Sequence, residues 1–218
     1  MNIVLINGSP KGEKSCSKKL LDIVKSSFDK ENNVYEFTIT DKRIKDLDKF
    51  DVLSNCDKII IAFPLYVDCL PSTTIKFLED FEKYMKDNRL KCTAKLYCIV
   101  NCGFHEGVQN RQALKIIKNF TKHIEKINYC GGIGIGTGPL IGINFNNLLE
   151  EKIKSPVMKI LDNFIKAIGD GECMTKDLFI ESNLNKKVYM QIANLSWISS
   201  AIKNKINIGG INNKPYKK

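Results

Sequence analysis

A loop crowded with hydroxyl groups follows the first apolar run of the chain. Gly8-Ser9-Pro10-Lys11 and Ser15-Cys16-Ser17 lie between that run, residues 2–7, and a stretch with helical spacing. Amide groups at the start of a helix lack partners within the helix and favour an anion, so the three serines predict a phosphate site. The alternative is that Ser15 or Ser17 only caps the helix.

The spacing of glycines excludes two common nucleotide sites. The first loop matches neither G-x-x-x-x-G-K-[ST] nor G-x-G-x-x-G, so a phosphate monoester suits it better than a triphosphate or a dinucleotide. A later run, Gly131 to Gly138, also gives no frame of G-x-G-x-x-G. We expect these later glycines to let a strand and its loop approach a neighbouring backbone, or a second copy of the chain, closely.

Two further loops carry aromatic and polar residues. Pro64-Leu65-Tyr66-Val67 follows one apolar run, and Asn101-Cys102-Gly103-Phe104-His105-Glu106 follows the next. Tyr66 offers a planar apolar ring with a polar end, although it also fits an ordinary surface aromatic. Gly103 would permit close backbone approach, and Asn101 offers hydrogen-bond donors. His105 has the chemistry to protonate a substrate, but a single histidine in a loop is more often solvated.

The three loops each follow a predicted strand of an α/β fold. Runs typical of strands occur at 2–7, 34–40, 59–63, 94–100 and 129–135, and helical spacing occurs at 20–28, 44–53, 75–85, 113–124 and 148–168. Pro156 predicts a kink or break in the last helix. The alternation predicts a doubly wound, five-stranded parallel sheet of order 2-1-3-4-5. Ligands bind such sheets at the carboxyl ends of the strands, where all three loops would lie.

The pattern changes after Gly169-Asp170-Gly171. We therefore expect one domain over 1–169 and a C-terminal helical extension over 170–218. Apolar residues from Tyr189 to Ile202 predict one apolar helix face. This face could join two copies of the chain, pack against its own domain, or lie on an anionic lipid surface.

Composition and charge narrow the class of protein. The chain has 218 residues, 43% hydrophobic and 27% charged, and a formal net charge of +10. Almost all the excess is lysine, whereas sequence-specific nucleic-acid contacts rely on arginine, so no nucleic-acid partner is expected. No leader or membrane-spanning run is visible. We therefore expect a cytoplasmic protein without a membrane partner.

The spacing of the eight cysteines matches no redox or metal-binding motif. They form no C-x-x-C pair, and no histidine lies at zinc-ligand spacing, so no metal site is predicted. We expect reduced, mostly buried thiols. Cys69 and Cys102, in the second and third loops, have no evident neighbouring base and would only line a site.

The three loops together resemble those of the flavodoxin-like NAD(P)H-dependent FMN reductase family. That family has G-S-P-[RK] followed by S-x-[ST] in the first loop and P-x-Y in the second, and here Lys11 stands where many members carry arginine. Tyr189, Trp197 and Lys214-Pro215-Tyr216 are similar to a subgroup with a C-terminal helical extension. The resemblance implies FMN contacts from Ser9, Lys11, Ser15, Cys16, Ser17, Pro64, Leu65, Tyr66, Val67, Asn101, Cys102, Gly103, Phe104 and Glu106.

The resemblance also implies an activity. FMN would take electrons from NADPH or NADH and pass them to a small-molecule acceptor, a quinone, flavin, nitro or azo compound, in a homodimer and with no catalytic side chain strictly required. The alternatives are a non-enzymatic electron carrier or redox-sensing flavoprotein, and a relative in fold that binds no flavin. Carriers of this fold are usually shorter and acidic, which favours the enzyme.

Overall fold

The computed structural model describes residues 1–28, 32–41, 46–90, 92–141, 147–206 and 208–210. The chain divides into two compact units, Met1–Asn183 and Leu184–Lys218. This division lies later in the chain than the boundary expected from the sequence. No helix among the described residues is long and apolar enough to cross a membrane.

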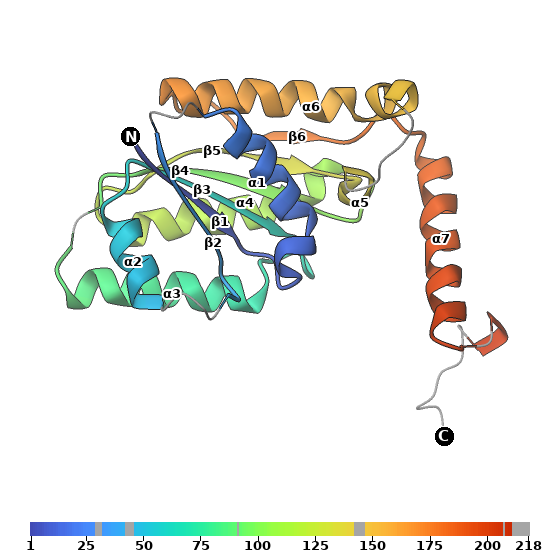
Figure 1. Ribbon diagram of the computed structural model, residues 1–218, viewed down its shortest axis with the longest axis horizontal. Helices are drawn as coiled ribbons and strands as arrows, with labels where there is room; N and C mark the ends of the chain where they lie inside the picture. Colours follow the sequence, from blue (N-terminus) through green and yellow to red (C-terminus); the bar gives the residue numbers. More distant parts are fainter. Residues whose placement is uncertain (29–31, 42–45, 91, 142–146, 207, 211–218) are drawn as a thin grey trace. The chain divides into compact units, whose positions relative to one another are not determined.

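The first unit is built on a parallel sheet of six strands (Figure 1). In chain order these are β1 Asn2–Asn7, β2 Asn33–Thr38, β3 Lys58–Pro64, β4 Lys95–Asn101, β5 Asn128–Ile135 and β6 Leu178–Ile180. Their spatial order is β2-β1-β3-β4-β5-β6. The predicted order of the first five strands is confirmed, and the predicted count of five is wrong. β6 has only three residues, too few for a period to stand out, and its pairing with Ile133–Ile135 of β5 defines it.

Helices cover both faces of this sheet. They are α1 Cys16–Ser26, α2 Asp46–Ser54, α3 Ser72–Asp87, α4 Arg111–Phe120, α5 Gly138–Ile141 and α6 Asn147–Asp170, with short 3₁₀ turns η1 Gly12–Lys14, η2 Gly107–Asn110 and η3 Thr121–His123. α1 and α6 lie on one face, and α2, α3 and α4 lie on the other (Figure 1). α6 runs through Pro156 without the break that the sequence suggested.

Alternating side chains of the strands feed two separate cores. Along β1, Ile3 and Leu5 pack with α1 and α6, whereas Val4 and Ile6 pack with α2 and α3. Strands covered on both faces are expected to be apolar throughout, as Ile59–Phe63 in β3 is. The polar residues Asn7 and Asn101 come last in β1 and β4, and they stay buried there.

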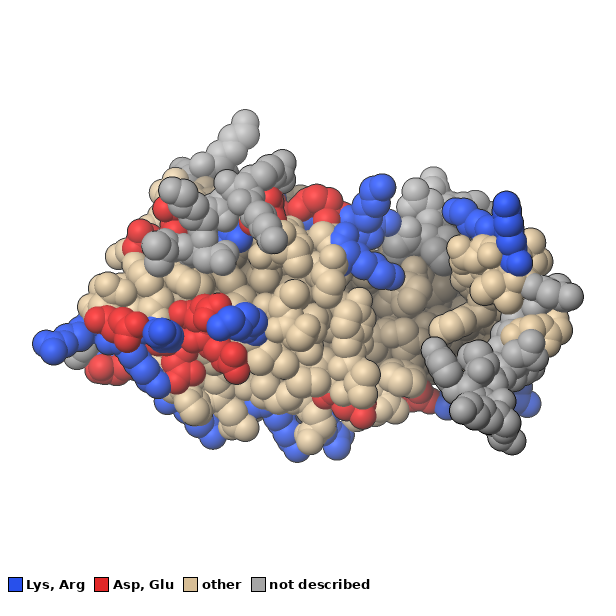
Figure 2. Space-filling view, turned by 90° about the horizontal axis from the view of Figure 1, so that it is seen from below, with Lys and Arg blue, Asp and Glu red and all other residues tan. Residues whose placement is uncertain are grey.

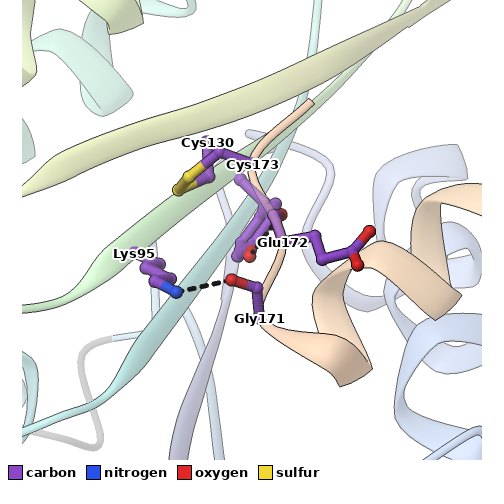
Figure 3. Close-up of a disulfide and its surroundings, with 6 residues drawn as sticks. Lys95, Cys130, Gly171, Glu172 and Cys173 are labelled. Carbon is purple, nitrogen blue, oxygen red and sulfur yellow. Dashed lines mark hydrogen bonds between the residues drawn. A yellow bond between two sulfur atoms is a disulfide. The ribbon is translucent and has the colours of Figure 1, made fainter. Parts of the chain in front are cut away.

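Two lysines hold the carboxyl end of α6. Lys58 Nζ donates to the Gly169 carbonyl over 2.9 Å, and Lys95 Nζ donates to the Gly171 carbonyl (Figure 3). Positive charge at this end of a helix offsets the partial charge of the unpaired carbonyl groups. Burial and the neighbouring Lys95 lower the pKa of Lys58. The pair fixes where the chain leaves α6 toward β6.

A disulfide joins β5 to the segment after α6. Cys130, buried in β5, is bonded to Cys173 (Figure 3). The Met174 amide donates to the Cys130 carbonyl over 2.9 Å. The expectation that all cysteines are reduced thiols is therefore wrong for this pair. The two residues are 43 positions apart in sequence, so only the return of the chain along β5 brings them together.

Close approach explains three glycines at the end of β5. A Cβ atom on Gly136 would lie 2.1 Å from the His105 carbonyl oxygen, and one on Gly134 would lie 3.0 Å from the Gly107 carbonyl oxygen. A Cβ atom on Gly138 would lie 2.9 Å from the Cys102 carbonyl oxygen. The prediction that these glycines admit a neighbouring backbone is confirmed, and that backbone is the loop after β4.

The surface on the α3 side carries mixed charge. Figure 2 shows acidic and basic side chains interspersed there, and Lys76–Asp80 and Lys86–Glu82 are ion pairs along α3. Such pairs favour a solvated helix surface over a binding site for a polyanion. Among the described residues of this face, basic side chains therefore lie beside acidic ones.

The second unit contains α7, Lys186–Lys203, and the short turn η4, Ile208–Gly210. Asn185 caps α7 by accepting a hydrogen bond from the Lys187 amide over 2.9 Å. Several large apolar side chains on α7 are exposed, among them Leu195 and Trp197, the latter by 76%. Lys214-Pro215-Tyr216 lies outside the described residues.

Reduction of the Cys130–Cys173 disulfide should destabilise the first unit. A cross-link between residues 43 positions apart restricts the unfolded chain, so the free energy of unfolding should fall by about 2–4 kcal/mol. Urea unfolding with and without a phosphine reductant measures this. The double variant Cys130→Ala/Cys173→Ala is the control, because the reductant should not change it. Equal stability of the wild type in both conditions would contradict the prediction.

A crowded glycine, Gly136, and an open one, Gly103, should respond differently to substitution by alanine. Gly136→Ala forces a methyl group against backbone and should lower the free energy of unfolding by about 3 kcal/mol. At Gly103, apart from the glycine and its two chain neighbours, no heavy atom of the described residues lies within 4 Å of the Cβ position. Gly103→Ala should therefore change the free energy of unfolding by less than about 0.5 kcal/mol. Urea unfolding of both variants tests the pair, and equal losses would refute it.

Candidate functional site

Three predicted loops meet at one edge of the sheet, where the strands β1, β3 and β4 end. The Leu65 amide, after β3, donates to the Asn101 carbonyl of β4 over 2.8 Å. Asn101 Nδ2 donates to Ser17 Oγ over 2.8 Å and to the Phe63 carbonyl over 3.2 Å. Asn101 thus joins the ends of β3 and β4 to the start of α1. We refer to this place as the carboxyl edge.

The first loop places its serine hydroxyls inward. Ser9, Ser15 and Ser17 are all buried. Ser15 Oγ accepts a hydrogen bond from the Lys18 amide over 3.1 Å, so Ser15 is the N-cap of α1, as the alternative interpretation held. The exposed basic side chains of the loop are Lys11 and Lys14. Contact between the loop and a phosphate stays a prediction, with the first-turn amides of α1 as the donors that a helix leaves unpaired.

The second loop folds into a tight hairpin turn. Tyr66 and Cys69 exchange two backbone hydrogen bonds of 2.9 and 3.0 Å. Between them Val67 has φ 49° and Asp68 has φ 58°, a left-handed conformation that a β-branched residue such as valine rarely adopts. Val67 is 97% exposed and Tyr66 41%, whereas Leu65 is buried and Pro64 is half-buried. Backbone strain of this kind concentrates where a loop must present particular side chains.

The third loop is open at its middle and anchored at its ends. Gly103 and Phe104 are exposed, Phe104 by 55%, while His105 and Glu106 are half-buried. The Cys102 amide donates to the Ile135 carbonyl over 2.9 Å. The side-chain NH₂ group of Asn101 donates to two protein oxygens. Asn101 therefore positions the neighbouring elements of the site. Direct contact between Asn101 and a ligand stays a prediction, as does a catalytic part for His105.

A fourth loop, after β5, belongs to the same edge and was not identified from the sequence. The Thr137 amide donates to the Phe104 carbonyl over 2.6 Å, and the Gly138 amide donates to the Cys102 carbonyl over 2.8 Å. Cys16 Sγ donates to the Gly138 carbonyl over 3.2 Å. Thr137 is buried and has φ 52°. The glycine run before it was the available signal, but it pointed to packing and not to a site.

The end of β6 supports the third and fourth loops. The Glu181 carboxylate accepts a hydrogen bond from the Gly107 amide over 3.1 Å, and the Ser182 amide donates to Thr137 Oγ1 over 3.0 Å. No sequence signal marked these residues, because the strand that delivers them was itself missed.

The thiols near the edge are poor nucleophiles. Burial raises the pKa of Cys16 to about 12, against the opposing effect of Lys19 and Lys154. Burial also raises the pKa of Cys102, whose sulfur accepts a hydrogen bond from Asn110 Nδ2 over 3.4 Å. Since the thiolate is the reactive form, both residues stay protonated at neutral pH and act as lining groups.

A separate groove of about 750 Å³ lies between α1, α5 and α6. Its lining is apolar at Ile23, Ile141 and Met158, with Lys19 and Lys154 among its charged residues. None of its described lining residues is a predicted site residue, so the groove is distinct from the loops of the carboxyl edge.

Comparison with known proteins supports the fold. No protein-family model matches the chain, and no curated protein matches it by sequence. Solved structures do match. The flavoenzyme NAD(P)H:(acceptor) oxidoreductase FerB from Paracoccus denitrificans is 16% identical, with a TM-score of 0.54 over 77% of this chain and 94% of that one. An NADPH-quinone reductase from P. pentosaceus is 13% identical, with a TM-score of 0.53 over 76% and 96%.

An NADH:FMN oxidoreductase in its apo form, EmoB, is 14% identical, with a TM-score of 0.51 over 76% of this chain and 88% of that one. Identities this low establish the fold and leave the activity open. The resemblance seen in the loops is therefore confirmed at the level of architecture: the chain has the fold of the flavodoxin-like NAD(P)H-dependent FMN reductases.

Proposed function

We propose that this protein is an FMN-dependent oxidoreductase that transfers electrons from NADPH or NADH to a small-molecule acceptor, a quinone, flavin, nitro or azo compound. The observation that carries the proposal is the meeting of three loops through Asn101 at the carboxyl edge, where doubly wound sheets bind their ligands. The names of the similar structures, which include quinone and FMN reductases, support the same class.

The first loop fits the phosphate end of FMN. The amides of Cys16 and Ser17 lie in the first turn of α1, where the helix leaves donors unpaired and its dipole favours an anion. Lys11 and Lys14 are exposed on the same loop and add positive charge. A single phosphate would be held by backbone donors and by these two cations.

The second and third loops fit the ring end. The space next to Gly103 would admit a planar group close to the backbone, and Tyr66, Val67 and Phe104 expose apolar surface that such a group could cover. Bound FMN would supply the hydride and electron chemistry. The chain would fix the ring and keep water from it, with protonated thiols at Cys16 and Cys102 that do not compete as nucleophiles.

We further propose a homodimer. Exposed apolar side chains on α7, such as Leu195 and Trp197, are the surface of the second unit that a partner copy would cover. Light scattering of the purified chain should give twice the mass of 24.7 kDa. Trp197→Lys should shift this mass toward the monomer, and a monomeric wild type would contradict the proposal. A cytoplasmic location stays a prediction.

The activity is tested by absorbance under anaerobic conditions. The protein loaded with FMN should show a flavin spectrum that bleaches on addition of NADPH or NADH and returns when a quinone is added. Steady turnover with nicotinamide and quinone supports the enzyme. Slow reduction by both nicotinamides, with fast reduction by a protein donor, would instead show an electron carrier.

A paired variant separates the site from the fold. Gly103→Leu fills the open space of the third loop and should reduce FMN affinity at least about tenfold without changing stability. Gly169→Ala, at the end of α6, is the control and should leave FMN affinity unchanged. Apart from its chain neighbours and the backbone of its own helix, no described atom lies within 4 Å of its Cβ position. A wild-type protein that fails to quench FMN fluorescence would overturn the proposed function.

A further inference from the structure

We propose that Asn7 is a positioning residue that shapes the first loop for a phosphate group. This inference rests on the proposed function and adds a residue that the loop motifs do not include. Asn7 is the last residue of β1 and its side chain is completely buried. It lies directly before Gly8, where the first loop begins.

Every hydrogen-bonding group of the Asn7 amide has a partner. Nδ2 donates to the Gly12 carbonyl over 3.0 Å and to Thr38 Oγ1 over 3.2 Å. Oδ1 accepts from the Ser9 amide over 3.1 Å and from Ser15 Oγ over 3.4 Å. A side-chain amide has two donors and two acceptor sites, so this network uses the full capacity of the residue.

These bonds decide which atoms of the loop face inward. The Gly12 carbonyl oxygen, whose partial negative charge would repel an anion, accepts from Asn7 Nδ2 and is thereby turned into the protein. The Ser15 hydroxyl donates to Asn7 Oδ1, so Asn7 also holds the side chain of Ser15 in place. Ser15 in turn caps α1 through the Lys18 amide. Asn7 therefore links the turn of the loop, where Gly12 has φ 60°, to the helix end that offers donors to an anion.

The opposite side of the network is held by β2. Thr38 is paired with Asn7 in the sheet, and its hydroxyl donates to Glu13 Oε1 over 2.9 Å. Glu13 belongs to η1 in the middle of the first loop. The loop is thus fixed from both directions by one buried amide and one hydroxyl, and no apolar or purely anionic side chain at position 7 could make the same four bonds.

The test compares FMN with riboflavin, which lacks the phosphate. Fluorescence quenching gives both affinities for the wild type, Asn7→Asp and Asn7→Leu. We expect FMN affinity to fall at least about tenfold in both variants while riboflavin affinity stays within about twofold, because only the phosphate contacts the loop that Asn7 shapes. Tyr97→Phe is the control. It removes a partly buried hydrogen bond, from the Tyr97 hydroxyl to the Glu172 carbonyl, and should leave both affinities unchanged.

Three outcomes would overturn the inference. The first is unchanged FMN affinity in the Asn7 variants. The second is an equal fall for FMN and riboflavin, which would show a structural role only. If the Asn7 variants fail to fold, as judged by circular dichroism, Thr38→Val removes one partner of Asn7 and should still reduce the preference for FMN over riboflavin. The third outcome is that Thr38→Val leaves the preference for FMN over riboflavin unchanged. A wild type that binds no FMN would instead contradict the proposed function.

Discussion

The carboxyl edge depends on the need of buried amide groups for hydrogen-bond partners. A parallel sheet covered on both faces is apolar along its strands, and here it ends in Asn7 on β1 and Asn101 on β4. An unpaired polar group at such depth costs about 1–3 kcal/mol. Each asparagine therefore brings loop atoms to itself, and the loops are fixed as a consequence of satisfying these side chains.

The same requirement explains why the edge extends over four loops. Asn101 accepts from the loop after β3 and donates to the start of α1, while the loop after β5 bonds to the residues that follow Asn101. Glycines in and after β5 make this approach possible, because a side chain there would meet the backbone of the loop after β4. β6 then supports that loop through Glu181. Pairing of the outermost strand, β6, thus contributes to the geometry of the candidate site.

The opposite end of the sheet provides the return path of the chain. Lys58 and Lys95 bind the carbonyl groups at the end of α6, and the Cys130–Cys173 disulfide holds the following segment beside β5. Together they direct the chain into β6. Because β6 delivers Glu181 and Ser182 to the third and fourth loops, these contacts connect stability at one end of the sheet to order at the other.

The sequence by itself determined the alternation of strands and helices, the order of the first five strands and the edge at which the three loops lie. Apolar runs and helical spacing are local signals, and the chirality of crossovers then restricts the topology. Only the tertiary structure decided that Ser15 caps α1, that Cys130 bonds Cys173, and that Leu178–Ile180 forms a sixth strand. These three features depend on which distant or buried atoms become neighbours in the folded chain. The local periodicity of the sequence does not predict those contacts.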